Sequence, residues 1–323
     1  MRYFVLYNDN VLLLEYGPGN YLYSIPRACL TSSYRICKNK FCSNGKFLYR
    51  SNNKNSLINI YNLNTFDIVV KECFVTEMVA VENGVILLTA KNIPELWNNK
   101  LTKLVYSFDE LKGTNKIFEV SDVSFACQKT ESFVFFNVKN KRKEISVNFE
   151  NYRTVHVFAC SSKYHVFAKV EFKDQIIYCM WHEDKLVNGW DDVIKEEIAK
   201  VIGKRMPDIT LGIKYAAFSP SADKLLIGEP ELYVKVFDIR NLQIIFSFTK
   251  NLGNVKFFFL DYRFIINKDF EVIDLKYFKS MKLLWPCEMM SLTDFYFCRK
   301  RKLVFTFSLD VPAHSAKIIL PRE

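Results

Sequence analysis

The sequence predicts an all-β protein built from a repeated unit, and three observations support this. The 323 residues include 29 Phe and 17 Tyr, but only 10 Gly and 9 Pro. Aromatic and β-branched residues fit the half-buried surface of a sheet. Short apolar runs alternate with polar turn residues, as in strands joined by turns. Finally, an apolar residue followed by Asn, Asp or His recurs near the ends of such runs at nearly constant spacing.

Residues 215–248, "YAAFSPSADKLLIGEPELYVKVFDIRNLQIIFSF", show the unit most clearly. We expect strands over residues 214–218, 233–237 and 243–248, with residues 224–228 leading up to the second of them. The stretches "SPSAD" and "RN" supply the turns. The pair Phe237-Asp238 stands at the end of the second expected strand.

We call such a pair an anchor. The anchors are Tyr61-Asn62, Trp97-Asn98, Phe136-Asn137, Trp181-His182, Phe237-Asp238, Ile273-Asp274 and Leu309-Asp310. Their spacings are 36, 39, 45, 56, 36 and 36 residues, which is typical of a repeat architecture. The longest interval contains the seventeen residues 191–207, and without them it returns from 56 to 39.

These residues resemble the WD-repeat β-propeller family. Residues 215–248 are similar to its full repeat, and residues 95–108 to its closing half, with Trp97-Asn98 at the Trp-Asp position. The resemblance implies one closed ring over residues 1–323 with seven four-stranded blades, or eight as the alternative, and places Trp97 between blades. The family's Gly-His pair is missing, and Glu229-Pro230-Glu231 replaces the Asp before the third strand. We therefore expect Phe, Tyr, Ile and Leu packing to hold the blades together.

The N-terminal residues 4–25 resemble the second half of a repeat, with Glu15-Tyr16 in the anchor position. In a closed ring, strands from the two chain ends commonly share a blade, which removes an exposed edge. We expect strands within residues 1–26 to help close the ring in this way.

The insertion, residues 191–207, predicts the one clear helix, over residues 191–204. Asp191 or Asp192 can cap its start, Gly203 stands at the C-cap position, and Pro207 ends it. A stripe at helical spacing is formed by Ile194, Ile198, Val201 and Ile202. The stripe can pack on the side of the propeller, or it can offer a handle to a partner.

The sequence predicts no enzyme, and no catalytic, cofactor-binding or metal-binding residues. Five residues of the types that bind zinc lie close together in the sequence: His156, Cys160, His165, Cys179 and His182. On a strand, His156 and Cys160 would lie about 13 Å apart. Cys179 and His182 are an odd number of residues apart, so they would face opposite sides of a strand. We expect ordinary packing of these side chains and no metal.

The formal net charge of +10 can indicate an anionic partner, although only "KNKRK" at residues 139–143 and "RKRK" at residues 299–302 form compact basic runs. Both runs fit polar turns between strands. The nine Cys are scattered, which suits buried free thiols in a reducing compartment. No apolar run reaches the roughly 18 residues needed to span a bilayer. We expect an intracellular protein of the cytoplasm, with the nucleus as the alternative.

The resemblance implies a non-enzymatic scaffold that docks other proteins or peptides on the faces of its ring. The alternative is a basic surface that binds RNA, DNA or an anionic lipid. A third class, an enzyme with clustered Asp or Glu in a central channel, is singled out by no residue of this sequence. We expect no small-molecule substrate and no cofactor.

Overall fold

The structure is a computed structural model. It describes the chain outside residues 1, 9, 18–19, 22–38, 53–55, 63–64, 66–67, 203–212, 230–232, 250–256, 260–261, 268–270, 283–291, 299–302, 309–313 and 318–323. Within these described residues the strands form eight antiparallel sheets, six of four strands and two of three. Each sheet is made of strands that follow one another in sequence. The predicted all-β fold with one inserted helix is therefore confirmed, whereas ring closure and the number of blades stay predictions.

The chain divides into two compact units, residues 1–117 with 284–323, and residues 118–283. The strands of the first unit are β1 (Arg2–Asn8), β2 (Asn10–Gly17), β3 (Asn20–Tyr21), β4 (Asn39–Ser43), β5 (Phe47–Asn52), β6 (Leu57–Asn62), β7 (Ile68–Glu72), β8 (Glu77–Val81), β9 (Gly84–Leu88), β10 (Pro94–Asn98), β11 (Leu104–Ser107), β28 (Leu292–Cys298), β29 (Leu303–Ser308) and β30 (His314–Lys317). A short 3-10 helix, η2 (Asp109–Leu111), follows β11. Within this unit β4 lies beside β8 and β28, and β1 lies beside β30.

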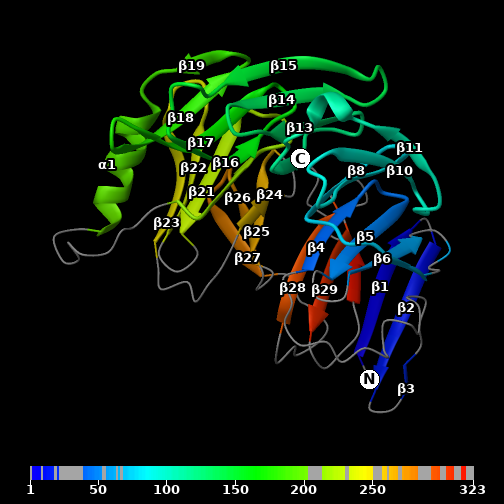
Figure 1. Ribbon diagram of the computed structural model, residues 1–323. Coiled ribbons are helices and arrows are strands. Elements are labelled where there is room, and N and C mark those ends of the chain that lie inside the picture. Colours follow the sequence, from blue (N-terminus) through cyan, green and yellow to red (C-terminus); the bar gives the residue numbers. More distant parts are fainter. Residues whose placement is uncertain are drawn as a thin grey trace. The chain divides into compact units, whose positions relative to one another are not determined.

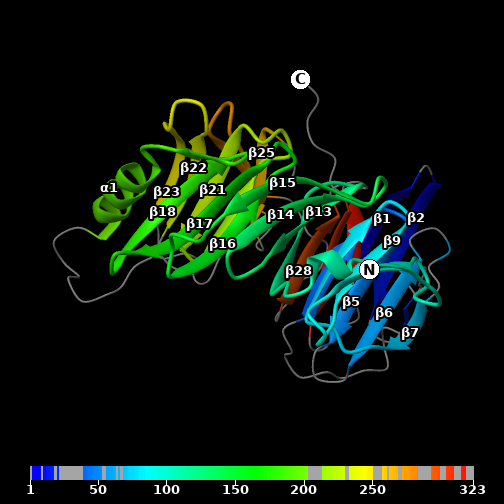
Figure 2. The ribbon, with the colours of Figure 1, turned by 45° about the horizontal axis from the view of Figure 1, so that its top comes forward.

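The second unit contains four sheets and the helix α1. Its strands are β12 (Lys116–Glu119), which crosses the boundary between the units, β13 (Ser124–Gln128), β14 (Ser132–Asn137), β15 (Arg142–Asn148), β16 (Thr154–Cys160), β17 (His165–Phe172), β18 (Gln175–His182), β19 (Lys185–Val187), β20 (Tyr215–Phe218), β21 (Lys224–Glu229), β22 (Tyr233–Asp238), β23 (Ile244–Thr249), β24 (Phe257–Phe259), β25 (Phe264–Asn267), β26 (Glu271–Asp274) and β27 (Lys279–Lys282). The first strands β16, β20 and β24 of successive sheets neighbour one another. Figure 1 labels the strands of sheets β16–β19 and β24–β27. Figure 2 shows the hairpin order of β16, β17 and β18 within one sheet.

Hydrophobic layers between neighbouring sheets form the core of the second unit. Alternate residues of one strand enter different layers, because successive side chains of a strand point to opposite faces. On β17, Phe167 packs toward sheet β20–β23, and the next residue, Ala168, packs toward sheet β12–β15. On β22, Phe237 packs toward sheet β16–β19, and Val236 packs toward sheet β24–β27. The expected packing of aromatic and aliphatic side chains between sheets is thus observed.

Six anchors end the third strands of the six four-stranded sheets, on β6, β10, β14, β18, β22 and β26. The seventh, Leu309-Asp310, lies outside the described residues. Residues 224–228, which the sequence attached to the following strand, belong to a separate strand, β21. Trp97 is only partly buried against the layer between sheets β4–β7 and β8–β11, whereas Trp181 is fully buried.

The helix α1 (Trp190–Ile202) begins one residue earlier than predicted, directly after Gly189. Asp191 does not cap it: its Oδ1 accepts a hydrogen bond of 2.9 Å from the backbone N–H of Tyr178, which ties the first turn to β18. Gly203 and Pro207, and the side chain of Ile198, lie outside the described part of the chain. No helix in the described residues is both long and apolar enough to cross a membrane.

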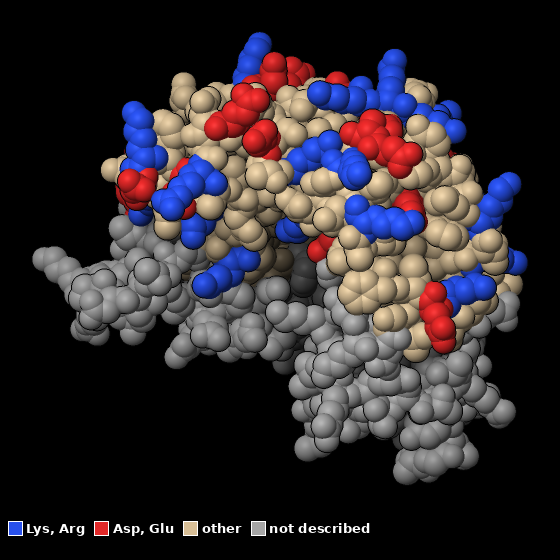
Figure 3. Space-filling model, viewed as in Figure 1, with Lys and Arg blue, Asp and Glu red and all other residues tan. Residues whose placement is uncertain are grey.

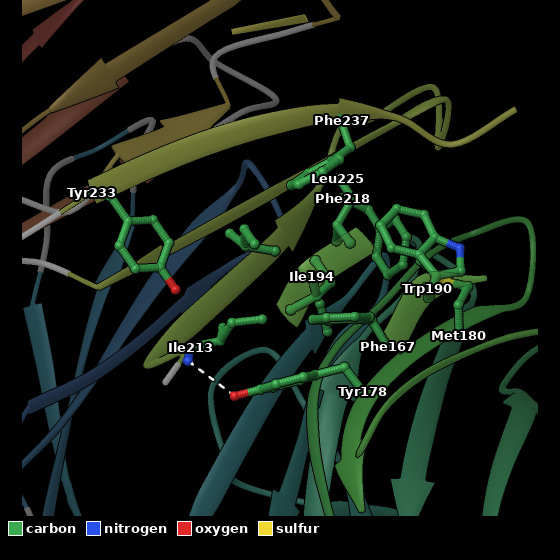
Figure 4. Close-up of a cluster of buried hydrophobic side chains, with 12 residues drawn as sticks. Phe167, Tyr178, Met180, Trp190, Ile194, Ile213, Phe218, Leu225, Tyr233 and Phe237 are labelled. Atoms are coloured by element: carbon green, nitrogen blue, oxygen red, sulfur yellow. Dashed lines mark hydrogen bonds between the residues drawn. The ribbon is translucent and has the colours of Figure 1, made fainter. Parts of the chain in front are cut away.

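The described half of α1 packs into the protein. Trp190 and Ile194 are fully buried in the layer between sheets β16–β19 and β20–β23, beside Phe167 and Phe237 (Figure 4). One turn further along, Glu197 forms a buried ion pair with Lys235 of β22. These contacts support the packing interpretation of the helix over the handle interpretation.

Candidate functional site

The polar residue of an anchor builds the turn that follows the third strand. In five sheets its side-chain oxygen accepts a hydrogen bond from a backbone N–H of the turn: Asn62 from Thr65 (3.3 Å), Asn98 from Thr102 (2.9 Å), Asn137 from Asn140 (3.0 Å), Asp238 from Arg240 (2.8 Å) and Asp274 from Lys276 (2.9 Å). Asn and Asp favour turns because their short side chains can reach the backbone in this way. The recurring Asn or Asp of the sequence therefore marks a turn cap.

These turns share one edge of each sheet with the turns that precede the second strands. In the ladder, the polar anchor residue pairs with the first residue of the second strand: Asn98 with Gly84, Asn137 with Ser124, Asp238 with Lys224 and Asp274 with Phe264. We call this edge the turn edge of a sheet. Because binding residues concentrate on loops held by a rigid scaffold, the turn edges are the candidate functional surfaces.

The basic run 139–143 lies at the turn edge of sheet β12–β15. All five side chains of "KNKRK" are exposed, in the turn between β14 and β15 and at the start of β15. This run is the polar turn that the sequence predicted. The other run, residues 299–302, lies outside the described residues. Over the face drawn in Figure 3, Lys and Arg are interspersed with Asp and Glu.

Two histidines stack at the turn edge of sheet β16–β19. The rings of His165 and His182 are 4.4 Å apart and nearly parallel, and Phe218 of β20 stacks on His165 at 5.8 Å. Nδ1 of His165 lies 3.0 Å from Oγ of Ser161. Burial, with the neighbouring charges of His182 and Lys163, lowers the pKa of His165 from 6.5 to about 4. His165 is therefore neutral at pH 7 and serves packing and hydrogen bonding.

Of the five candidate zinc ligands, His165 and His182 stack on each other, and the other three are held by separate contacts. The ring of His156 meets Phe158 edge-on at 4.7 Å, and Sγ of Cys160 lies 3.9 Å from the backbone oxygen of Glu119. Cys179 is packed in the layer between sheets β12–β15 and β16–β19, where burial and Asp191 raise its pKa to about 11. Among the described residues, no three His, Cys, Asp or Glu are grouped to hold a metal ion.

Two buried ion pairs of the structure are not predicted from the sequence. Nζ of Lys235 lies 2.5 Å from a carboxylate oxygen of Glu197 and 3.1 Å from the Glu197 backbone oxygen. At the turn edge of sheet β24–β27, Arg263 donates two hydrogen bonds to Asp274, from Nε to Oδ1 (2.9 Å) and from Nη2 to Oδ2 (2.6 Å). The bonds from Arg263 hold the pKa of Asp274 below its usual range. The sequence does contain a sign of the first pair. Lys235 lies between Tyr233 and Phe237 at every second position of a strand, so its side chain points to the same buried face and needs a charged partner there.

Comparison with known proteins gives a likeness in structure but none in sequence. No protein-family profile matches the sequence, and no curated protein matches it. Among solved structures, the chain is similar to one described as Kluyveromyces lactis Hsv2 complete loop 6CD, at 11% identity and a TM-score of 0.49. The likeness covers 84% of this chain and 92% of that chain.

Proposed function

We propose that the chain is a non-enzymatic scaffold that binds other proteins or peptides, built as one closed WD-like ring over residues 1–323. We infer seven blades, with eight as the alternative. The observation that carries the proposal is the set of six four-stranded antiparallel sheets, each with an anchor at the end of its third strand. Such sheets stack through their faces and leave their turns at the edges, where partners can reach them.

The chemistry of the turns supports a binding role. The cores of the sheets are alike, since each layer is filled by buried aliphatic and aromatic side chains. The turns differ: one carries the basic run 139–143, one carries the stacked His165 and His182, and one carries exposed aromatic rings. Constant cores with different turns suit a scaffold that presents distinct surfaces to distinct partners.

Closure of the ring is supported by the position of the N-terminal strand. β1 lies beside β30 in the first unit, and a blade shared by strands from the two chain ends would need these strands to be neighbours. Pairing between them would remove an exposed sheet edge. We place the protein in the cytoplasm, with the nucleus as the alternative, in keeping with its scattered cysteines.

The second candidate function is binding of RNA, DNA or an anionic lipid surface. The net charge of +10 and the exposed run 139–143 favour it. Against it, acidic side chains are interspersed with the basic ones over the face in Figure 3, which weakens any extended positive field. Most Phe side chains that the structure describes are buried between sheets, where they cannot stack on bases.

Affinity purification of the full chain tests the proposal. The chain is captured from cells with and without nuclease treatment, and the bound proteins, nucleic acid and lipid are identified. A scaffold retains the same proteins after nuclease treatment, in amounts comparable to the bait. Recovery of nucleic acid or lipid with no stoichiometric protein would contradict it and favour the second candidate.

A further inference from the structure

The outermost strand of sheet β4–β7 differs from those of the other four-stranded sheets. An unpaired strand edge can bond to another chain, and proteins commonly protect it with a bulge, a short strand or charged side chains. The strands β11, β15 and β23 each pair with their neighbour across a register shift. β19 has only three residues, and β27 begins and ends with Lys. β7 pairs with β6 over five residues in one continuous register, and its first three residues are Ile, Val and Val.

The backbone of β7 alternates between groups that bond to β6 and groups that point away from it. Directly after the strand, the N–H of Cys73 donates a hydrogen bond of 2.6 Å to the backbone oxygen of Ser56, which precedes β6. Bonded and non-bonded pairs alternate along an antiparallel ladder. The N–H and C=O of Lys71 and Val69 therefore also point toward β6, and those of the residues between them point outward.

The outward groups belong to Val70 and Glu72. β7 is the last strand of its sheet, beside β6 (Figure 2), and within the described residues no hydrogen bond reaches these outward groups. Apolar side chains accompany them: Val69 is 39% and Val70 53% exposed, and Phe74, just beyond the strand, is 53% exposed. Free donors and acceptors at strand spacing fit an extended segment that adds to the sheet as a further strand.

Two charges at the end of β7 indicate which side chains that segment carries. Within the part of the chain that the structure describes, neither Lys71 nor Glu72 has an ion pair. Residues directly opposite each other in an antiparallel pair interact, and opposite charges there are stabilising. A complementary strand would therefore place an acidic residue opposite Lys71 and a basic residue opposite Glu72.

The neighbouring carboxylates leave this pairing open. Burial and the charge of Glu95 on β10 raise the pKa of Cys73, so this carboxylate lies near the end of β7. Glu95 accepts a hydrogen bond of 3.2 Å from Trp97 and forms no ion pair with Lys71. Asp67 precedes β7 and lies outside the described residues. Opposition of side chains across a strand pair at Lys71 and Glu72 does not involve Asp67.

A second copy of β7 would satisfy the backbone but not these charges. In an antiparallel pair, residues whose backbone groups point outward bond to one another. A pair centred on Val70 would place Lys71 opposite Val69, and Glu72 opposite Ile68. A pair centred on Lys71 would place the two Lys71 side chains opposite each other, which is destabilising. The charges therefore favour a different protein.

We propose that β7 binds an extended segment of a partner protein as a fifth, antiparallel strand. The segment carries apolar residues opposite Val69 and Val70, an acidic residue opposite Lys71 and a basic residue opposite Glu72. In such complexes the main-chain bonds provide affinity and the alternating side chains provide specificity. Antiparallel pairing is slightly more stable than parallel pairing. The inference deepens the proposed scaffold function and rests on it.

Short labelled peptides test the proposal by fluorescence anisotropy with the full-length chain. The matched peptide contains Lys-Glu-Val-Val, which in an antiparallel strand lie opposite Glu72, Lys71, Val70 and Val69 in that order. The swapped peptide contains Glu-Lys-Val-Val, and the double-basic peptide contains Lys-Lys-Val-Val. The reversed peptide contains Val-Val-Glu-Lys and matches only a parallel strand.

Two variants and one control are compared with the wild type. Val70→Pro removes an outward N–H and keeps the bonds to β6, which come from Val69 and Lys71; edge strands tolerate proline at such positions. Lys71→Glu reverses one charge. The control is Leu104→Ser with Val105→Ser, which removes two exposed aliphatic side chains from β11.

The wild type and the control should bind the matched peptide about tenfold more tightly than the swapped peptide, because two opposite-charge pairs become like-charge pairs. Val70→Pro should weaken binding of the matched peptide about tenfold, through loss of a main-chain bond at the centre of the strand. Lys71→Glu should prefer the double-basic peptide over the matched one. That reversal of preference cannot arise from a folding defect, so it tests the proposal even where Val70→Pro fails to fold.

Amide hydrogen exchange of the wild type gives a second readout. In the free chain the amides of Val70 and Glu72 should exchange quickly and those of Val69 and Lys71 slowly. Saturation with the matched peptide should protect Val70 and Glu72. Unchanged exchange at both positions, or equal binding of the matched and swapped peptides, would overturn the proposal.

Three further outcomes would also overturn it. Tighter binding of the reversed peptide would show a parallel strand. Dimers of the wild type in sedimentation experiments, lost in Val70→Pro, would assign the edge of β7 to a second copy. If affinity purification recovers the same proteins with wild type and Val70→Pro, the scaffold function stands and the proposal for β7 falls. If neither recovers any protein, the scaffold function itself fails.

Discussion

The two buried ion pairs of the second unit perform different tasks. Lys235 and Glu197 come from a strand and from the inserted helix, and their pair lies next to a hydrophobic layer. Arg263 and Asp274 come from the turn edge of one sheet, and the guanidinium of Arg263 lies over the exposed ring of Tyr277. The first pair joins an insertion to the core, and the second positions a surface. A buried ion pair can thus stabilise the attachment of a helix in one sheet and hold a surface turn in the next.

Breaking the helix pair should have the largest effect. Glu197→Ala leaves Lys235 buried without its carboxylate, which should cost about 3–5 kcal/mol of unfolding free energy. Urea denaturation measures the loss. The double variant Glu197→Leu with Lys235→Met should recover most of it, because apolar residues can replace a buried pair. A loss below about 1 kcal/mol for Glu197→Ala would show that water reaches Lys235 and that the helix is only loosely attached.

Acid should destabilise the protein through His165 and through the Arg263–Asp274 pair in different pH ranges. The unfolded chain protonates His165 near pH 6.5, whereas the folded chain does so only near pH 4. Stability should therefore fall from pH 6.5 to pH 4, by up to about 3 kcal/mol, and then level off for this group. Arg263 lowers the pKa of Asp274. The contribution of Asp274 to stability is therefore fully present above pH 3.8 and is lost only as the pH falls below that value.

Chemical denaturation at a series of pH values checks this order. In His165→Asn the decline between pH 6.5 and pH 4 should be much smaller, while the loss at lower pH remains. An unchanged decline in that variant would assign it to another group and show that His165 is accessible to solvent when folded.

Breaking the Arg263–Asp274 pair should cost less unfolding free energy than breaking the Lys235–Glu197 pair. Asp274→Asn keeps an oxygen for the turn but removes the charge that faces Arg263, at a cost of about 1–3 kcal/mol. The guanidinium lies at the turn edge and can turn toward water, which Lys235 cannot do as easily. The same denaturation experiment compares the two variants. A cost for Asp274→Asn equal to that of Glu197→Ala would remove the proposed difference between the pairs.

The repeat was readable from the sequence because the anchors mark the ends of third strands. Asn98, Asn137, Asp238 and Asp274 each accept a hydrogen bond from the following turn, so the residue type is dictated locally. The hydrophobic layers were expected for the same reason, since apolar residues alternate along the strands. Features that depend on one segment of the chain are the ones that the sequence predicts.

Features that join distant segments were missed. Glu197 is an ordinary helix residue until Lys235, far along the chain, is placed beside it. Tyr277 and Phe278 resemble core residues of a strand, and only the turn geometry shows that they are exposed. Trp97 was expected between blades, but it is partly exposed and donates a hydrogen bond of 3.2 Å to Glu95. Exposure is decided by neighbours that a single sequence does not reveal.

Amide hydrogen exchange along β30 tests the closed ring most directly. In a strand at the edge of a sheet, alternate N–H groups point away from the neighbouring strand and exchange quickly with water. If β1 pairs with β30, as the ring requires, consecutive amides from His314 to Lys317 should all be protected. Protection of every second amide only would show that β30 is a free edge and would contradict the closed ring.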